Sequence, residues 1–364
     1  MNNCQHHNQT IRRLSTRIDE SYASYLSNAW QDICDTITYN SGKSFGETTS
    51  ILPFNYSTNI GYPTYFTLAP GGILYGMPYT ENRIIKLDTN TDTITTFGDF
   101  SSSEGKWNGS VYHAGNGCIY SAPTNASGVL KFEVATETWT TLGTDSGYFG
   151  TMIAPNGYVY VIPGDNRYIL KIHPYTDEIT KIDTNNTTER KWTGGVLLPD
   201  GKIYCVARHY TKMLVIDTMT DTLSEVGSFT QNANNRYNSG IYTPSGHLYI
   251  YGYDVLDYNI TTNTYSTKIS NSVMMGGVGH NGVLYLLNRD GQNIRRIDTV
   301  TNSVLSTITR SCYYSVPILA PNGCMYATAA QYLNGKGILK ISLNISDGRN
   351  FKESTLLSPY LNKY

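Results

Sequence analysis

The segment PNGYVY, residues 155–160, is one copy of a pattern that recurs along this 364-residue chain. In every copy a glycine is followed by any residue, an apolar residue and a tyrosine. The seven copies are PGGILY (70–75), GNGCIY (115–120), PNGYVY (155–160), PDGKIY (199–204), PSGHLY (244–249), HNGVLY (280–285) and PNGCMY (321–326). Proline presets φ and glycine accepts positive φ, so such a copy predicts a β-turn that leads into a strand. We therefore interpret PNGYVY as a repeated structural unit and not as a glycine loop with its own chemistry.

The spacing of these copies predicts the fold. Their turn glycines lie 45, 40, 44, 45, 36 and 41 residues apart. A second element follows each copy, such as IIKLDTNTDTIT (84–95) or ILKIHPYTDEIT (169–180), and indicates a strand, a polar turn and usually another strand. Each repeat thus holds four strands, here termed a to d, which at this period are typical of a β-propeller blade. The alternative, an open β-solenoid, usually has shorter rungs.

The sequence therefore predicts an all-β protein, a seven-bladed β-propeller of four-stranded antiparallel blades over residues 59–364. A helical segment, residues 1–58, precedes it. In the last repeat a strand d is expected at residues 352–357, so that the ring need not borrow a strand from the N-terminus. A closing strand at residues 51–55 is the alternative.

The repeats resemble those of seven-bladed propellers of the streptogramin-lyase-like and YncE-like type, whose blades carry the elements PNGxIY and ILxID. The resemblance extends over about residues 60–358. It implies the fold, but such propellers include enzymes, surface binding proteins and many chains of unknown role. The lyase members use a channel site with histidine, glutamate and magnesium. His113 and His209 are expected on the channel side here, but no carboxylate is clearly placed with them, so we expect no catalytic residue, metal or cofactor.

The N-terminal segment contains one apolar stripe at helical spacing. Its members are Ile11, Leu14, Ile18, Tyr22, Leu26, Trp30, Ile33 and Ile37. Positions three and four residues apart share one face of an α-helix, so this face must be buried. It packs either on the flank of the propeller itself or on another protein, including a second copy of the chain. Membrane-surface binding is disfavoured because the polar side has few cations.

Bulk composition excludes several classes of partner. The formal net charge is -1 and there is no basic run, so nothing indicates nucleic-acid binding. No apolar run approaches the ~20 residues of a membrane span. The N-terminus lacks the apolar core of a secretory signal, which indicates cytoplasmic synthesis. The six cysteines form no CxxC pair, so buried free thiols are expected.

The blade plan places the short a–b and c–d turns on one face and the longer, more variable b–c and d–a loops on the other. We expect a binding site on the second face, because loops on a rigid scaffold are free to diversify. Aromatic residues recur there, nine or ten positions before the turn glycine. They are Tyr62, Trp107, Tyr148, Trp192, Tyr237 and Tyr314. They either wedge adjacent blades together or form a ring at the channel mouth that stacks on a ligand. Arg167, Arg208 and Arg289 in the b–c loops are candidate polar partners.

The expected role is that of a non-enzymatic module that presents this loop-rich face to a protein or glycan. The N-terminal helix would dock on a larger assembly. Few charges, much Asn, Thr, Tyr and Gly, and a separate helix suggest a decoration or host-recognition protein of a virus particle, such as a phage capsid or tail. A lyase or hydrolase acting in the channel and an intracellular peptide-binding scaffold are the alternatives.

Overall fold

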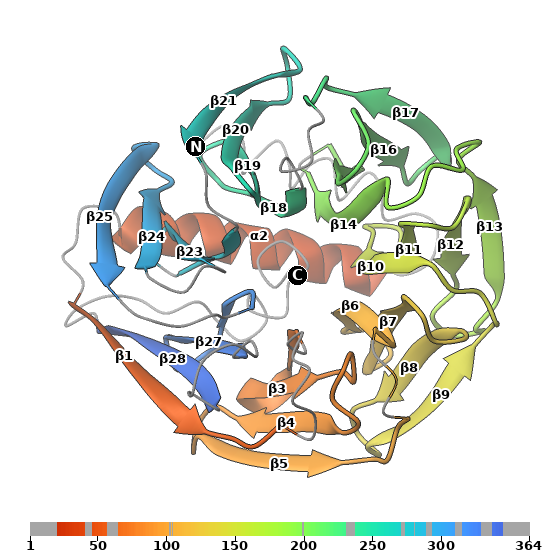
Figure 1. Ribbon diagram of the computed structural model, residues 1–364, viewed down its shortest axis with the longest axis horizontal. Coiled ribbons are helices and arrows are strands. Elements are labelled where there is room, and N and C mark those ends of the chain that lie inside the picture. Colours follow the sequence, from red (N-terminus) through yellow and green to blue (C-terminus); the bar gives the residue numbers. More distant parts are fainter. Residues whose placement is uncertain are drawn as a thin grey trace.

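The computed structural model describes residues 20–40, 46–56, 65–101, 103, 105–198, 200–230, 237–270, 274–279, 281–288, 293–309, 315–328 and 337–344. Seven four-stranded antiparallel sheets are arranged in a ring (Figure 1). This confirms the predicted seven-bladed β-propeller. Helix α2 (Glu20–Asn40) precedes it.

The blades follow the sequence repeats in order. Blade 1 holds β2 (Phe66–Ala69), β3 (Ile73–Gly76), β4 (Ile84–Asp88) and β5 (Thr93–Phe97), with the short 3₁₀ turn η1 (Pro70–Gly72) between β2 and β3. Blade 2 holds β6 (Trp107–His113), β7 (Cys118–Pro123), β8 (Val129–Glu133) and β9 (Thr138–Leu142). Blade 3 holds β10 (Tyr148–Ile153), β11 (Val159–Pro163), β12 (Tyr168–Ile172) and β13 (Ile179–Asp183). Blade 4 holds β14 (Trp192–Leu197), β15 (Ile203–Ala207), β16 (Met213–Asp217) and β17 (Thr222–Val226).

The second half of the ring repeats the same plan. Blade 5 holds β18 (Tyr237–Tyr242), β19 (Leu248–Gly252), β20 (Val255–Asn259) and β21 (Thr264–Ile269). Blade 6 holds β22 (Met274–Val278), β23 (Val283–Asn288), β24 (Asn293–Asp298) and β25 (Ser303–Thr309). Blade 7 holds β26 (Ile318–Leu319), β27 (Cys324–Thr328) and β28 (Gly337–Asn344), and its fourth strand is β1 (Gly46–Pro53).

Strand β1 closes the ring from the N-terminal side. It pairs antiparallel with β28 along its whole length, from Gly46 opposite Asn344 to Pro53 opposite Gly337. The expectation that the ring borrows no N-terminal strand is therefore wrong, and the alternative of a closing strand near residues 51–55 is the better one. The propeller thus includes residues before the expected boundary at 58. The strand expected at 352–357 lies outside the described residues.

The repeated tyrosine joins each blade to the next. Tyr160 Oη donates to Asp221 Oδ1 at 3.0 Å, and Tyr326 Oη donates to Asp92 Oδ1 at 2.8 Å. Each of these carboxylates lies in the c–d turn of the following blade, at a φ of 57°. This left-handed conformation is one that aspartate tolerates better than most residues. The tyrosine of the repeat is therefore a contact between blades as well as a core residue.

The asparagine and lysine of the two repeat elements complete this contact. Asn156 Nδ2 donates to the Thr218 carbonyl at 2.6 Å, across the boundary between blades 3 and 4. Lys171 Nζ lies 2.6 Å from Asp221 Oδ2. The same pairing joins Lys131 to Asp177 and Lys340 to Asp92, each at 2.5 Å. We call the Asn–Tyr–Lys–acid set the inter-blade latch.

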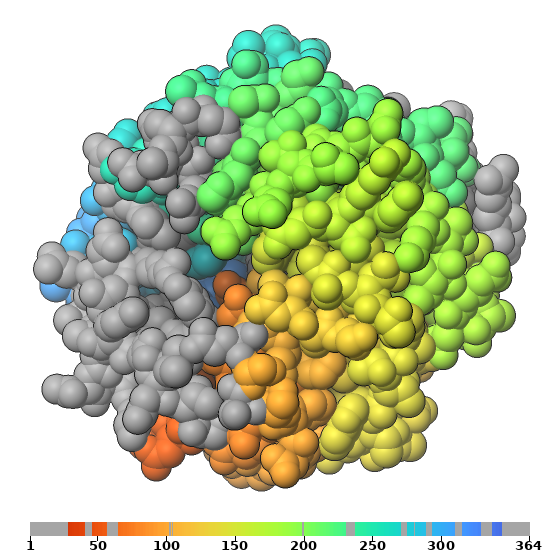
Figure 2. All heavy atoms as spheres, turned by 45° about the vertical axis from the view of Figure 1, so that its right-hand side comes forward, coloured from red at the N-terminus to blue at the C-terminus, as the bar shows by residue number. Residues whose placement is uncertain are grey.

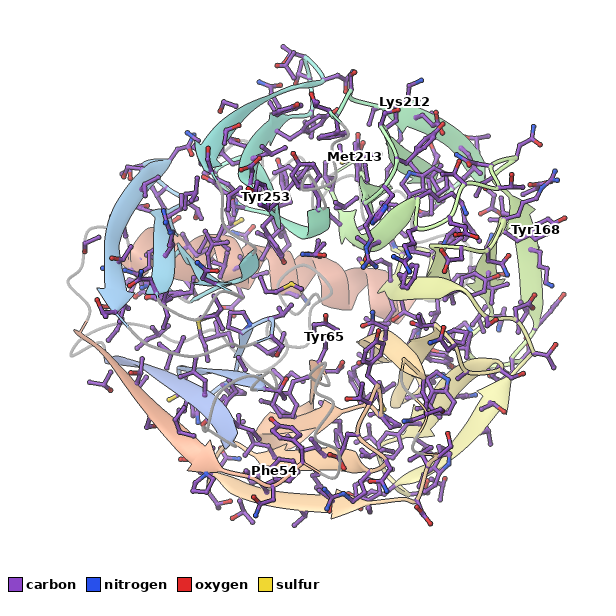
Figure 3. The ribbon with its side chains drawn as sticks, in the orientation of Figure 1. Phe54, Tyr65, Tyr168, Lys212, Met213 and Tyr253 are labelled. Carbon is purple, nitrogen blue, oxygen red and sulfur yellow. The ribbon has the colours of Figure 1, made fainter. Side chains whose placement is uncertain are left out.

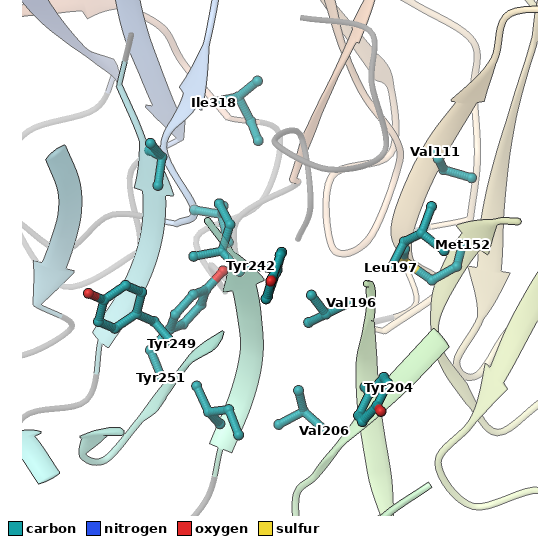
Figure 4. Close-up of a cluster of buried hydrophobic side chains, with 14 of the residues drawn as sticks. Val111, Met152, Val196, Leu197, Tyr204, Val206, Tyr242, Tyr249, Tyr251 and Ile318 are labelled. Atoms are coloured by element: carbon teal, nitrogen blue, oxygen red, sulfur yellow. The ribbon is translucent and has the colours of Figure 1, made fainter. Parts of the chain in front are cut away.

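The boundary between blades 4 and 5 lacks the cation of this latch. Val215 pairs with Tyr204, as Lys171 pairs with Tyr160 in the preceding blade. The hydroxyl of Tyr204 points back to Asp200 in its own a–b turn, at 3.5 Å. Apolar packing dominates here, and Figure 4 shows Val196, Val206 and Tyr242 among the buried side chains of this part of the core.

Helix α2 packs on the face of the ring that carries the a–b turns (Figure 1). Trp30 and Ile33 are fully buried, and the Trp30 ring stacks on that of Tyr242 with centroids 6.0 Å apart. Ile37 lies against the turn glycine Gly282, where a Cβ atom would come within 2.8 Å of Ile37 Cγ2. The apolar face of this part of the helix is thus occupied by the protein's own ring.

The remaining positions of the predicted stripe are not seen in detail. Ile11, Leu14 and Ile18 lie outside the described residues. Tyr22 and Leu26 lie within helix α2, but nothing is described of their side chains. No helix in the described part of the chain is long and apolar enough to cross a membrane.

The cysteines differ in part from expectation. Cys118, Cys205 and Cys324 are free thiols, as predicted. Cys34, on the buried side of helix α2, forms a disulfide whose partner lies outside the described residues. The expectation of a free thiol at Cys34 is therefore wrong, because spacing along the sequence does not reveal which cysteines the fold brings together.

Candidate functional site

The loop-rich face of the ring carries the b–c and d–a loops, opposite helix α2. Close to this face the innermost strand is irregular in four consecutive blades. Pairing with strand b shifts by one residue between Asn108 and Ser110, Tyr148 and Gly150, Thr193 and Gly195, and Tyr237 and Ser239. Such β-bulges redirect side chains and are frequent next to functional sites. Figure 2 shows blades 2 to 4 as a continuous surface.

Four of the six predicted rim aromatics lie within the described residues, and all four are buried. Trp107 is 8% exposed, Tyr237 is 2% exposed, and Tyr148 and Trp192 are fully buried. Trp107 Nε1 donates to the Gly128 carbonyl, and Trp192 Nε1 donates to the Lys212 carbonyl, both at 2.9 Å. These rings therefore support the b–c loops of their own blades and offer no open face for stacking. This favours the packing interpretation over the ligand-binding one.

Two of the predicted rim aromatics, Tyr62 and Tyr314, lie outside the described residues. Among the aromatic side chains labelled in Figure 3, Tyr65 lies nearest to the centre of the ring. It is half-buried and packs against the main core.

The predicted arginines differ in their partners. Arg167 forms a two-pronged ion pair with Asp183 of the same blade, with Nε 2.7 Å from Oδ1 and Nη2 2.6 Å from Oδ2. Arg208 lies over the ring of Phe149, with Cζ 5.1 Å from the centroid. Its Nε atom is buried and donates to no acceptor among the described residues. Arg289 lies outside them.

Backbone hydrogen bonds join the loops around Arg208 into one unit. The amide of Arg208 donates to the Lys191 carbonyl, and that of His209 donates to the Arg190 carbonyl, each at 2.9 Å. The amide of Arg190 donates to Asp165 Oδ1 at 2.7 Å. We call Phe149, residues 164–166, residues 188–191 and residues 208–209 the blade 3–4 loop cluster.

Lys191 forms the buried base of this cluster. Its side chain is fully buried, and its ammonium donates to the carbonyls of Gly164 at 3.1 Å, Asn166 at 2.5 Å and Thr188 at 3.2 Å. Loss of hydration on burial lowers the pKa of Lys191 to about 8, although the nearby Asp165 carboxylate acts in the opposite direction. The ammonium thus holds the loops of blades 3 and 4 together.

Two other residues shape the cluster. Phe149 is the extra residue of the β-bulge in blade 3, and its ring covers Gly164, where a Cβ atom would lie 1.5 Å from the ring. Glycine is thus required at that position. Arg190 is exposed and has a φ of 51°. A long side chain rarely adopts this left-handed conformation, and such strain often marks functional sites.

The two histidines expected near the channel do not form a catalytic pair in the structure. His113 is fully buried at the a–b turn of blade 2, and its Nε2 atom lies 3.0 Å from the Gly157 carbonyl. Its Nδ1 atom accepts from the amide of Asn116 at 3.3 Å. Both ring nitrogens of His113 are therefore used in turn packing, while His209 belongs to the loop cluster on the other face. No group of three or more metal-ligating side chains occurs within the described ranges.

Comparisons with known proteins support the propeller fold but show no closer relationship. The sequence matches no protein-family model and no curated protein. A streptogramin B lyase structure aligns with a TM-score of 0.66 at 18% identity over 81% of this chain and 98% of that one. The inactive virginiamycin B lyase of Staphylococcus aureus with quinupristin aligns with a TM-score of 0.65 at 12% identity, over 82% of this chain and all of that one. The resemblance stated from the repeats is thereby confirmed at the level of fold.

Other similar structures differ in function from these lyases. Hydrazine synthase of Kuenenia stuttgartiensis aligns with a TM-score of 0.63 at 13% identity, over 82% of this chain and all of that one. The extracellular domain of a putative hybrid two-component system of B. thetaiotaomicron aligns with a TM-score of 0.64 at 13% identity, over 82% of this chain and 42% of that one. At such identities the similarity describes the propeller alone.

Sequence reasoning found Arg208 but missed Phe149, Arg190 and Lys191. One signal was present: lysine precedes tryptophan at both 106–107 and 191–192, where a buried lysine lies directly before strand a. The bulge and the left-handed Arg190 leave no such pattern in the sequence.

Proposed function

We propose that this protein is a non-enzymatic binding module whose loop-rich face binds a protein or glycan. The observation that carries the proposal is the asymmetry of the ring. The face with the a–b turns is covered by the protein's own helix through Trp30 and Ile37. The opposite face presents the bulged strand ends and the blade 3–4 loop cluster. A rigid ring with one covered and one open face suits recognition by loops.

A steric block of either face tests the proposal. The probes are two conjugates of the full chain, each with polyethylene glycol attached at one introduced cysteine. Thr187→Cys places the polymer on the loop-rich face, whereas Tyr175→Cys places it in the c–d turn of blade 3. Both native side chains are exposed. Binding to a glycan array or to a captured protein should be lost for the first conjugate and kept for the second. Loss with the Tyr175→Cys conjugate alone would contradict the proposal.

The larger role that we propose is decoration or host recognition in an assembly such as a virus particle. The support is compositional: charged residues are 15% of the chain and tyrosine occurs 31 times. Part of helix α2 is already used by the ring, so docking would involve its remaining surface, including Tyr39, which is 54% exposed. The protein should co-sediment with particles. Recovery only as a free monomer would contradict this role.

The competing function is a lyase or hydrolase in the channel. The proposal of a non-enzymatic role is supported by His113, whose two ring nitrogens are occupied by backbone groups. A neutral imidazole with both nitrogens bonded has no free position for a metal or for proton transfer. Incubation with quinupristin and magnesium should leave the antibiotic intact by mass spectrometry. Its time-dependent loss would establish the enzyme instead.

A further inference from the structure

The Arg208 guanidinium forms no hydrogen bond with any described residue, in contrast to Arg167 one blade earlier. Both belong to b–c loops of the same face. Arg167 has a carboxylate partner in Asp183, bound through two nitrogen atoms. Arg208 has only the Phe149 ring beneath it, and its Nε atom is buried without an acceptor. The pair Arg167–Asp183 shows the partner that Arg208 lacks, because a carboxylate matches the planar donors of a guanidinium.

The surroundings of Arg208 carry a small excess of positive charge. The blade 3–4 loop cluster contains three cationic side chains, Arg190, Lys191 and Arg208, and two carboxylates, Asp165 and Glu189. With His209 neutral, one positive charge is left over. Asp165 accepts a hydrogen bond from the Arg190 amide, while the Arg190 side chain is exposed and forms no hydrogen bond or ion pair with the described residues. One excess charge suits a monoanion such as a carboxylate better than a dianion.

The site is rigid before any ligand arrives. Phe149 is fixed between Gly164 and Arg208, so the guanidinium rests on a ring that has little freedom. Lys191 fixes the loops beneath through three carbonyl contacts. A preorganised guanidinium loses less entropy on binding than a free surface arginine. This distinguishes the cluster from a set of solvated surface charges.

Hydroxyl-bearing residues lie in the same loops as these cations. Thr187 and Thr188 are exposed in the same d–a loop, and Tyr210 follows His209 in the b–c loop with its side chain half-buried. Such groups bind sugar hydroxyls, while the cation binds the charged group.

We propose that the blade 3–4 loop cluster binds the carboxylate of an acidic sugar, with Arg208 as the principal donor and Arg190 as the second. The inference rests on the proposed function, because it names the ligand class for the loop-rich face. The carboxylate of the sugar accepts hydrogen bonds from Arg208, as Asp183 does from Arg167. The rest of the sugar contacts the threonine-rich d–a loop.

Titration of the full chain with four small probes tests this inference. The probes are glucuronate, glucose, acetate and glucose 6-phosphate, followed by calorimetry or amide NMR shifts at low salt. Glucuronate should bind with a dissociation constant on the order of 1 mM, as expected for a ligand of this size, and more tightly than the other three. Arg208→Gln should weaken glucuronate binding by about tenfold or more, because a charged hydrogen-bond donor is lost. Arg208→Lys should give an intermediate loss.

Two further variants keep the test falsifiable. Arg190→Asn keeps a residue that tolerates the left-handed backbone and should weaken binding by a few-fold without affecting the fold. Arg167→Gln is the matched control and should leave glucuronate binding unchanged, because Arg167 is already paired. Equal binding of glucose and glucuronate, tighter binding of glucose 6-phosphate, or full binding by the Arg208 variants would overturn the inference. If glucuronate fails while the Thr187→Cys conjugate still blocks binding, the acidic-sugar assignment falls and the proposed function stands.

Discussion

At the scale of residues, the repeat Pro-Asn-Gly-x-apolar-Tyr forms a turn and also supplies contacts between neighbouring blades. The glycine allows the turn, with a φ of 80° at Gly157. The asparagine and the tyrosine donate hydrogen bonds to the next blade. The lysine of the following strand forms an ion pair with the same aspartate that accepts from the tyrosine. The sequence pattern predicted the turn because turn chemistry is local. It did not predict the latch, because the acid lies about 60 residues further along the chain.

The latch at Asp92 joins the last blade to the first, so its removal should destabilise the whole ring. Asp92→Ala removes acceptors of Tyr326 and Lys340 and should lower the free energy of unfolding by about 1–3 kcal/mol. Asparagine tolerates the left-handed backbone as aspartate does, so Asp92→Asn measures the loss of charge without the backbone strain that alanine adds. Asp145→Ala breaks the more exposed pair with Lys181 and should cost less than about 1 kcal/mol. Equal urea midpoints for Asp92→Ala and Asp145→Ala would show that the latch does not contribute as described.

Lys191 and the buried tyrosines predict opposite effects of alkaline pH on stability. Burial lowers the pKa of Lys191 to about 8 from 10.5, so the unfolded chain binds more protons between these values and stability should rise with pH there. Burial raises the pKa of Tyr242 and Tyr258 to about 12 from 10.0, so their contribution is complete below pH 10 and is lost as pH rises above it. Burial also raises the pKa of the Cys205 thiol from 9.0, which opposes the effect of Lys191 as pH rises above 9. Urea unfolding should therefore show a rise in stability between pH 8 and 9 and a fall beyond pH 10. Lys191→Met should reduce the rise and keep the fall, because burial also lowers the pKa of Lys106, which this variant retains. A monotonic decline in the wild-type protein from pH 8 would contradict the assignment to Lys191.

At the scale of elements, local pattern predicted the strands and the helix but not their long-range partners. The seven repeats predicted the number of blades, because each strand b follows a turn that the glycine of the repeat marks in the sequence. The closing strand β1 was ambiguous, because pairing Gly46 with Asn344 depends on the geometry of the closed ring and not on local sequence. The stripe of helix α2 predicted burial of Trp30 and Ile37, while its contact with Gly282 could not be seen from spacing. Burial of the rim aromatics likewise depends on loops far away in the sequence.

The contact of helix α2 with the ring should contribute to the stability of the whole protein. Trp30→Ala removes a fully buried ring that stacks on Tyr242 and should lower the free energy of unfolding by about 3–5 kcal/mol. Tyr39→Ala, at an exposed position of the same helix, is the control and should change it by less than about 0.5 kcal/mol. If Trp30→Ala unfolds with the midpoint of the Tyr39 variant, the helix does not pack on the ring in solution.

At the scale of the whole molecule, the ring has a face covered by helix α2 and a face of loops. The proposed binding role depends on this asymmetry. The fold alone does not assign a role, because lyases, hydrazine synthase and the extracellular domain of a putative hybrid two-component system share it at 12–18% identity. In the blade 3–4 loop cluster, an Arg208 side chain without a hydrogen-bond partner among the described residues, a β-bulge and a strained backbone coincide on the loop-rich face.

Hydrogen–deuterium exchange of the full chain, with and without the ligand found on the array, shows which face of the ring binds. Amides of residues 164–167, 186–191 and 208–212 should exchange more slowly when the ligand is bound, while those of helix α2 and of the a–b turns should not change. Protection confined to helix α2 or to the a–b turns would contradict a binding role for the loop-rich face.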